Sequence, residues 1–163
     1  MRDQQFQWLF AYGSNMNWKD VLRWLIDHGL PSMHPTETRI ATLDNYRLVW
    51  NYWSVARRGG AANIERAFGQ NLPGVLFRVE HAALLAMDRK EGRTYQRWLH
   101  PFHVQGDSKE IVAWVYEVKK EFQRETVVPP TPSYLSTVIH GAQCAGLPAS
   151  RIDALRRTPV RKS

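Results

Sequence analysis

The chain has 163 residues, of which 44% are hydrophobic, and its 22 Lys and Arg against 15 Asp and Glu give a formal net charge of +7. This length fits one domain, residues 1–163, which buries roughly two-thirds of the surface of its unfolded chain and needs no disulfide or metal to form a core. The basic residues are scattered rather than clustered, which is typical of solubility and weak attraction for anions and argues against a nucleic-acid-binding protein.

A strand, a turn and a helix are predicted in the first thirty residues. Gln7 to Tyr12 is an apolar run typical of a short buried strand, and it leads directly into the turn-forming residues 13–15. From Asn17 to His28 apolar residues recur at helical spacing, with Asn17 as the N-cap, and Gly29 ends the helix. A strand therefore brings a glycine-containing turn to its own end.

Strands dominate the next fifty residues. Residues 36–43 and 46–53 are rich in β-branched and aromatic side chains and are predicted to pair as a hairpin around Asp44-Asn45. Residues 55–63 contain two consecutive glycines and are expected to form a loop before a short strand around Ile64. A further compact strand is predicted over residues 74–79.

The second half alternates between helices and a hairpin. A short helix over residues 81–90 ends at Gly92, and residues 95–104 and 110–118 form a hairpin whose second strand we expect to be buried on both faces. The proline-rich stretch 129–132 leads into a helix over residues 133–144, and a last small helix follows Ser150. This irregular series predicts an α+β fold around a small mixed sheet or barrel.

Several classes of site and compartment are disfavoured by the sequence. No phosphate-binding, dinucleotide-binding or zinc-protease motif is present. His100 and His103 lie three apart on a predicted strand and so point to opposite faces, which disfavours a metal site. Cys144, on an apolar helix, is expected to be a core residue rather than a nucleophile, and a lone cysteine excludes an internal disulfide. With no apolar run long enough for a signal peptide or a membrane span, we expect a cytoplasmic protein.

Two features remain that could carry chemistry. The turn after Tyr12 can direct consecutive backbone N–H groups at an anion or a carbonyl oxygen, or it can be an ordinary strand-to-helix turn. Glu91 falls at the C-terminal end of a predicted helix, where the backbone dipole is negative. It is either solvated or paired with Arg89 or Arg93, or it faces a pocket and acts as a general base. The residues alone leave these alternatives open.

The first of these features resembles a known signature. Residues 10–15, Phe-Ala-Tyr-Gly-Ser-Asn, resemble the F-A-Y-G-S-N motif of the γ-glutamyl cyclotransferase-like (AIG2-like) enzymes. Further segments are similar to the family in the same order, namely residues 60–64, 73–77, 85–95, 129–134 and the helix up to 146–148. Nearly the whole chain is covered.

This resemblance implies a small mixed β-barrel with flanking helices and a cofactor-free reaction. A γ-glutamyl amide, the small-molecule partner, would become 5-oxoproline and a free amine or amino acid, with Glu91 as the general acid and base. The substrate-binding residues that the resemblance implies are Leu9, Phe10, Ala11, Tyr12, Gly13, Ser14, Asn15, Tyr95, Val118 and Tyr134. Nothing in the sequence distinguishes a monomer from a homodimer.

Departures from the family bear on specificity. Only Gly92-Arg93-Thr94 separates Glu91 from Tyr95, which is shorter than in some relatives. Residues 50–58, rich in aromatic side chains and ending in Arg57-Arg58, flank a loop that could line the pocket. Free γ-glutamyl amino acids, γ-glutamylamines and a γ-glutamyl-capped metabolite are all compatible, and glutathione is disfavoured because the glutathione-specific relatives lack the equivalent of Asn15. The alternatives are a non-catalytic binder of a small molecule or polyanion, and an amidohydrolase that releases glutamate.

Overall fold

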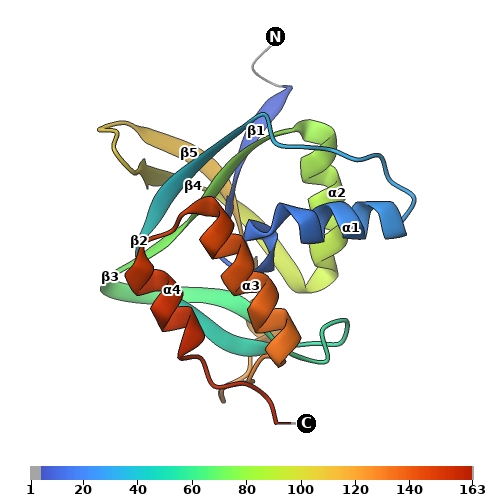
Figure 1. Cartoon of the computed structure of the whole chain (residues 1–163), viewed down its shortest axis with the longest axis vertical. Coiled ribbons are helices and arrows are strands. Elements are labelled where there is room, and N and C mark those ends of the chain that lie inside the picture. Colours follow the sequence, from blue (N-terminus) through green and yellow to red (C-terminus); the bar gives the residue numbers. More distant parts are fainter. Residues whose placement is uncertain (1–4, 163) are drawn as a thin grey trace.

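The computed structural model describes residues 5–162 and forms a closed β-barrel flanked by helices (Figure 1). The strands are β1 (Phe6–Ala11), β2 (Glu37–Ser54), β3 (Gly59–Glu80), β4 (Tyr95–Val104) and β5 (Glu110–Val118), in the barrel order β1-β3-β2-β4-β5. β1 and β5 are parallel where the barrel closes, and the other neighbouring pairs are antiparallel. The expected small mixed barrel with flanking helices is confirmed.

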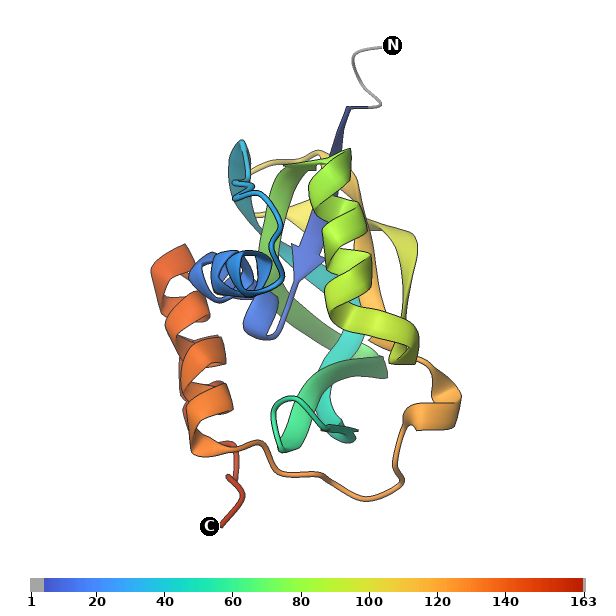
Figure 2. The same ribbon diagram turned by 90° about the vertical axis from the view of Figure 1, so that its right-hand side faces the viewer.

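Helices cover the outside of the barrel on more than one side. They are α1 (Trp18–Asp27), α2 (His81–Glu91), α3 (Pro132–Ala145) and α4 (Ala149–Arg156), with 3₁₀ turns η2 (Ser14–Met16), η3 (Gly92–Thr94) and η4 (Lys120–Phe122). In Figure 2, α2 lies along one side of the barrel, while α1 and α3 lie together on the other. No helix in residues 5–162 has the length and apolar character that crossing a bilayer requires.

The middle of the chain differs from the expected short strands. Residues 36–53 do not reverse at Asp44-Asn45, because β2 runs on continuously and pairs with β3 along its length. The register shifts between Asp44 and Tyr46, and Asn45 has a φ of 61°, so these residues form a bulge instead of a turn. The predicted hairpin there was wrong. The loop expected over residues 55–63 is only the tight turn 55–58, since β3 already begins at Gly59.

The alternation of the strands produces two hydrophobic cores. Phe10 points into the barrel, where it stacks on Phe102 with ring centroids 4.3 Å apart, whereas its neighbour Leu9 packs beneath the helices. β5 is buried on both faces only in part, because Val112 near its start is 58% exposed. β1, a strand of the barrel wall, thus separates the interior core from the helix-covered one.

The ends of the helices were predicted well from local signals in the sequence. The side chain of Asn17 accepts a hydrogen bond from the Asp20 N–H, and Gly92 and Gly146 follow their helices with positive φ. The expectation that Cys144 is a core residue was wrong: it is exposed, with Sγ 3.4 Å from His140 Nε2 one turn earlier. α3 turns a different stripe toward the barrel, made of Leu135, Val138 and Ala142 among others.

Candidate active site

The turn after β1 forms one wall of the site. Tyr12 is buried and its hydroxyl donates to the Tyr116 carbonyl at 2.6 Å, which fixes the end of the strand. A Cβ at Gly13 would lie 2.9 Å from the Ala62 Cβ, so only glycine permits this approach. The turn is closed by the N–H groups of Met16 and Asn17, which donate to the two carbonyls of residues 13 and 14. These bonds use none of the N–H groups of residues 13–15.

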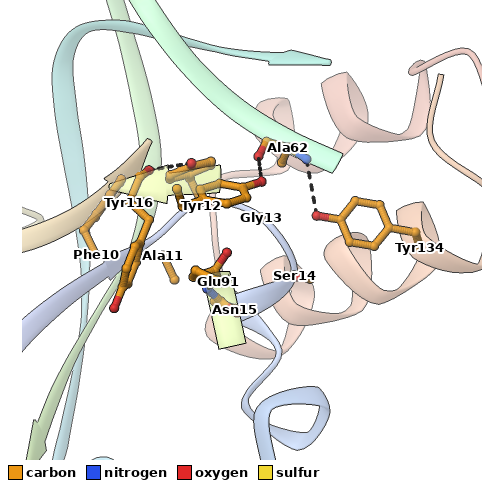
Figure 3. A pocket seen from close by; sticks show the side chains of 11 residues that line it. Phe10, Ala11, Tyr12, Gly13, Ser14, Asn15, Ala62, Glu91, Tyr116 and Tyr134 are labelled. Atoms are coloured by element: carbon orange, nitrogen blue, oxygen red, sulfur yellow. Dashed lines mark hydrogen bonds between the residues drawn. The ribbon is translucent and has the colours of Figure 1, made fainter. Parts of the chain in front are cut away.

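A bulge in β2 forms the opposite wall. The register shifts between Val49 and Tyr52, so that two residues of β2 face the single residue Ala62 of β3. The backbone of Ala62 bonds instead to two tyrosine side chains: its N–H donates to the Tyr134 hydroxyl at 3.3 Å, and its carbonyl accepts from the Tyr95 hydroxyl at 3.0 Å (Figure 3). Tyrosines from β4 and α3 are thereby brought together beside the turn.

Helix α2 delivers Glu91 to this place. The helix packs on the barrel through buried residues that include Leu84 and Met87, and Gly92 ends it directly after Glu91. Asp88, one turn earlier, accepts hydrogen bonds from Arg97 of β4 at 2.7 Å and from the Tyr116 hydroxyl at 2.7 Å. These contacts hold the last turn of α2 against β4 and β5.

The carboxylate of Glu91 contacts the turn after β1, although Asn15 and Glu91 lie 76 positions apart in the sequence. Its Oε1 accepts a hydrogen bond from Asn15 Nδ2 at 2.6 Å, and the two side chains lie together in Figure 3. Lys90 Nζ donates to Asn15 Oδ1 at 2.8 Å and lies 3.9 Å from the same carboxylate oxygen. Glu91 is only 13% exposed. Of the two environments left open above, the structure shows a carboxylate at a cavity rather than one paired with Arg89 or Arg93.

Two adjacent spaces lie beside these groups. An inner chamber of about 30 Å³ is lined by Phe10, Ala11, Tyr12, Gly13, Ser14, Asn15, Ala62, Glu91, Tyr95, Tyr116 and Tyr134. An outer groove of about 470 Å³ shares Ser14, Glu91, Tyr95 and Tyr134 with the chamber and extends between α1 and the turn 55–58. Glu91 therefore lies between the chamber and the groove and lines both.

The structure brings most of the predicted site residues to the chamber, with two exceptions. Leu9 faces the core beneath the helices, and Val118 is fully buried at the end of β5, where its N–H donates to the Asn63 side chain at 2.9 Å. Neither side chain is among those that line the chamber. The roles that the resemblance implies for them remain predictions.

Sequence reasoning missed other lining residues. Ala62 lies within a segment that matched the family, but its contribution comes from the backbone and depends on the bulge. Tyr116 lines the chamber, but in the sequence it is only one position of an alternating strand. Asp20 and Lys90 line the groove, but in the sequence they are ordinary charged residues of predicted helices. Tyr52 and Arg57, expected at the rim, do line the groove.

The tyrosines of the chamber keep their protons. Burial is the largest cause that raises the pKa of Tyr12, of Tyr95 and of Tyr134 above the ordinary value, and the negative charge of Glu91 adds to each shift. Their hydroxyls thus act as neutral hydrogen-bonding groups. In residues 5–162 no group of three or more His, Cys, Asp or Glu side chains is arranged to hold a metal ion.

Comparison with solved structures agrees with the fold described above. Among solved structures, one described as "Gamma-glutamyl cyclotransferase" aligns with a TM-score of 0.80 at 24% identity, covering 98% of this chain and 91% of that one. A protein of Homo sapiens described as uncharacterized aligns with a TM-score of 0.81 at 24% identity and the same coverage. YkqA from Bacillus subtilis aligns with a TM-score of 0.77 at 21% identity, covering 98% of this chain and 58% of YkqA. These likenesses show the fold.

The family itself is shown by sequence. No curated protein matches the chain. Residues 9–135, which contain the turn, Glu91 and Tyr134, match the family described as "Gamma-glutamyl cyclotransferase, AIG2-like". That span is well over half of the chain and includes the whole barrel from Leu9 onward. The chain belongs to the γ-glutamyl cyclotransferase, AIG2-like family.

Proposed function

We propose that this protein is a γ-glutamyl cyclotransferase that converts a γ-glutamyl amide into 5-oxoproline and a free amine or amino acid. One observation carries the proposal: the carboxylate of Glu91 lies at the mouth of a tyrosine-lined chamber, bonded at 2.6 Å to Asn15 of the turn that follows β1. A general base must lie within proton-transfer distance of a bound substrate, and this position satisfies that requirement for a ligand that fills the chamber mouth.

The reaction needs little covalent chemistry from the protein. The α-amine of the γ-glutamyl group attacks its own γ-carbonyl carbon, a C–N bond forms in a five-membered ring, and the bond to the leaving nitrogen breaks. Because nucleophile and electrophile belong to one molecule, the protein has only to hold the reactive rotamer. The rigid wall formed by Ala62 with its two tyrosine partners is suited to restrict that rotamer.

Proton transfer is the remaining requirement, and Glu91 serves both steps. The amine arrives largely as ammonium, so the carboxylate takes one proton before the attack and returns it to the leaving nitrogen. The second proton that the ring nitrogen loses on cyclisation follows the same route, and the amine departs as ammonium. The N–H groups of Gly13 and Ser14, which the turn's own bonds do not use, stabilise either the oxyanion or the α-carboxylate of the substrate. Proton number and charge balance without a further reactant.

The sizes of the two spaces suit a substrate that occupies both of them. The chamber volume of about 30 Å³ is too small for a whole γ-glutamyl amide, so the molecule must extend into the groove of about 470 Å³. Ligand sites are usually about 300–1,000 Å³. With Glu91 at the junction, the glutamyl end would lie toward the chamber and the amine half in the groove.

Replacement of the base tests the mechanism. In Glu91→Gln we expect kcat to fall by about two to four orders of magnitude, since general acid–base catalysis contributes roughly that factor, with an unchanged circular dichroism spectrum. Glu80→Gln is the matched control, because Glu80 is an exposed glutamate at the opposite end of the same helix. Equal turnover by Glu91→Gln and the wild type would remove Glu91 from the mechanism.

The product identifies the reaction class. The protein is incubated with γ-glutamyl-alanine, γ-glutamyl-ethylamide and other γ-glutamyl amides, and the products are identified by mass spectrometry. We expect 5-oxoproline. Free glutamate would indicate an amidohydrolase, and retained binding without turnover would indicate a non-catalytic binder; either result contradicts the proposal.

A further inference from the structure

The groove outside the chamber is enclosed by charged side chains in a fixed arrangement. Its walls are one face of α1 and the β2–β3 turn, and its charged lining residues are Asp20, Arg23, Asp27, Arg57, Lys90 and Glu91. Three acids and three bases cancel in total charge, so the groove does not select a substrate by net charge. Recognition there depends on which charged group lies beside the leaving nitrogen.

The guanidinium of Arg57 is held in place by contacts with two other elements. Its Nη2 donates to Asp20 Oδ2 at 2.7 Å and its Nη1 to Asp20 Oδ1 at 3.4 Å, which ties the β2–β3 turn to the first turn of α1. The guanidinium also lies over the ring of Tyr134, 5.1 Å from its centroid. Burial alone would disfavour the charge, but the bond with Asp20 holds the pKa of Arg57 above its ordinary value.

Arg57 still presents hydrogen-bond donors to the groove. Its side chain is 30% exposed, whereas that of its partner Asp20 is 11% exposed. A guanidinium has five N–H donors, and Asp20 occupies one on each Nη. Within residues 5–162, the structure pairs the Arg57 side chain with Asp20 alone, so Nε–H and the second N–H of each Nη are available to a ligand in the groove.

The position of Arg57 along the groove matches one kind of amine half. Tyr134, beneath the guanidinium, also lines the chamber, so Arg57 lies at the junction where the scissile bond would be. In an amino-acid leaving group the carboxylate is attached to the carbon next to the leaving nitrogen. Asp27, seven residues after Asp20, lies about 10 Å farther along α1. That is too far for it to contact a group attached next to the leaving nitrogen.

We infer that Arg57 is a specificity-determining residue that binds the carboxylate of the leaving amino acid, so that the preferred substrates are γ-glutamyl amino acids rather than γ-glutamylamines. This inference rests on the proposed function. Asp20 and the Tyr134 ring act on the substrate through Arg57 by holding its guanidinium in place. Lys90 is unsuited to the same task, because Asn15 and Glu91 already surround its ammonium.

A matched pair of substrates isolates the carboxylate. γ-Glutamyl-alanine and γ-glutamyl-ethylamide differ only in that group, so the ratio of their kcat/KM values measures its recognition. We expect the wild type to favour γ-glutamyl-alanine by about 10- to 100-fold, the range for a hydrogen bond to a charged group. In Arg57→Met the ratio should fall to within about threefold of one, mainly through KM for γ-glutamyl-alanine. Arg57→Lys should retain only part of the preference, because an ammonium lacks the fork of the guanidinium.

Controls separate recognition from folding and charge. Arg93→Met removes the same charge from an exposed position just after α2 and should keep the wild-type ratio. Since Arg57→Met leaves Asp20 without its partner, the double variant Asp20→Asn/Arg57→Met removes both charges and should also lose the preference. Thermal unfolding is followed for each variant.

The outcomes distinguish this inference from the proposed function. Formation of 5-oxoproline from both compounds with similar kcat/KM in the wild type, or an unchanged ratio in Arg57→Met and in the double variant, would overturn the role of Arg57 and leave the cyclotransferase reaction standing. Failure of the wild type to form 5-oxoproline from either compound would overturn the proposed function and the inference with it.

Discussion

The side chain of Asn15 connects the turn after β1 to the end of α2. Its amide nitrogen donates to Glu91 at 2.6 Å, and its amide oxygen accepts from Lys90 at 2.8 Å. An amide provides a donor and an acceptor at once, which neither a carboxylate nor an ammonium can do at this place. Asn15 therefore sets the orientation of the Glu91 carboxylate while adding no charge of its own.

The variant Asn15→Asp tests whether the side chain at position 15 must be uncharged. Lys90 would keep the new carboxylate ionised, and that charge, within hydrogen-bonding distance of Glu91, would oppose ionisation of the Glu91 carboxyl group. We expect the acidic limb of the pH profile of kcat/KM to move to higher pH by about one unit or more. The profile of Asn15→Ser, which loses the bonds but adds no charge, is the reference. Coincident acidic limbs for the two variants would show that charge at position 15 does not matter.

At the scale of the element, the helices were predictable from sequence and the long strands were not. Helix ends depend on a few neighbouring residues, such as Asn17 and Gly92, so their signals are local. Asp44-Asn45 is equally compatible with a turn and with a bulge, and only the pairing of β2 with β3 decides between them. Ala62 became a site residue for the same reason, since its unpaired backbone depends on a bulge in another strand.

The junction of α2 with β4 and β5 depends on one carboxylate. Burial alone would raise the pKa of Asp88, but hydrogen bonds from Arg97 and Tyr116 outweigh it, so the pKa lies below its ordinary value. An acid with a lowered pKa in the folded state stabilises the protein above its unfolded-state pKa, and this stabilisation is lost as the pH falls through the folded-state value.

Asp88→Asn should therefore destabilise the protein most near neutral pH. We expect the difference in free energy of unfolding from the wild type to shrink as the pH falls from 5 toward 3, measured by urea denaturation at each pH. Asp153→Asn, whose exposed carboxylate pairs with Arg156 on α4, serves as the control and should show little change at either pH. A penalty for Asp88→Asn that stays constant over this range would contradict the assignment.

At the scale of the whole molecule, the segment after α4, which contains Arg161, connects the helices to the β2–β3 hairpin that borders the groove. The N–H of Arg161 donates to the Pro130 carbonyl, its Nη1 donates to the Arg58 carbonyl at 2.8 Å, and its guanidinium lies 4.9 Å from the Trp53 ring centroid. Arg58 belongs to the same turn as Arg57. The C-terminal segment thus supports the turn from the side opposite α1.

Arg161→Ala should loosen this support. A hydrogen bond and an exposed cation–π contact together contribute about 1–2 kcal/mol, so we expect the melting temperature to fall by about 2–6 °C. KM for γ-glutamyl substrates should rise because the turn is less well held. Arg157→Ala, at an exposed position nearer α4, should change the melting temperature by less than about 2 °C. Equal melting temperatures for Arg161→Ala and the wild type would show that the segment gives no support.

The parallel contact between β1 and β5, which pairs Leu9 with Trp114, has a consequence for how the protein is made. The turn of residues 13–15 is synthesised well before β5, so until then the strand before it has at most one neighbour in the barrel, and Tyr134 follows later still. A nascent chain that has not reached residue 134 therefore contains the turn of residues 13–15 and Glu91 but lacks a completed chamber. The chamber is completed late in synthesis, when Tyr134 of α3 reaches Ala62 beside the turn.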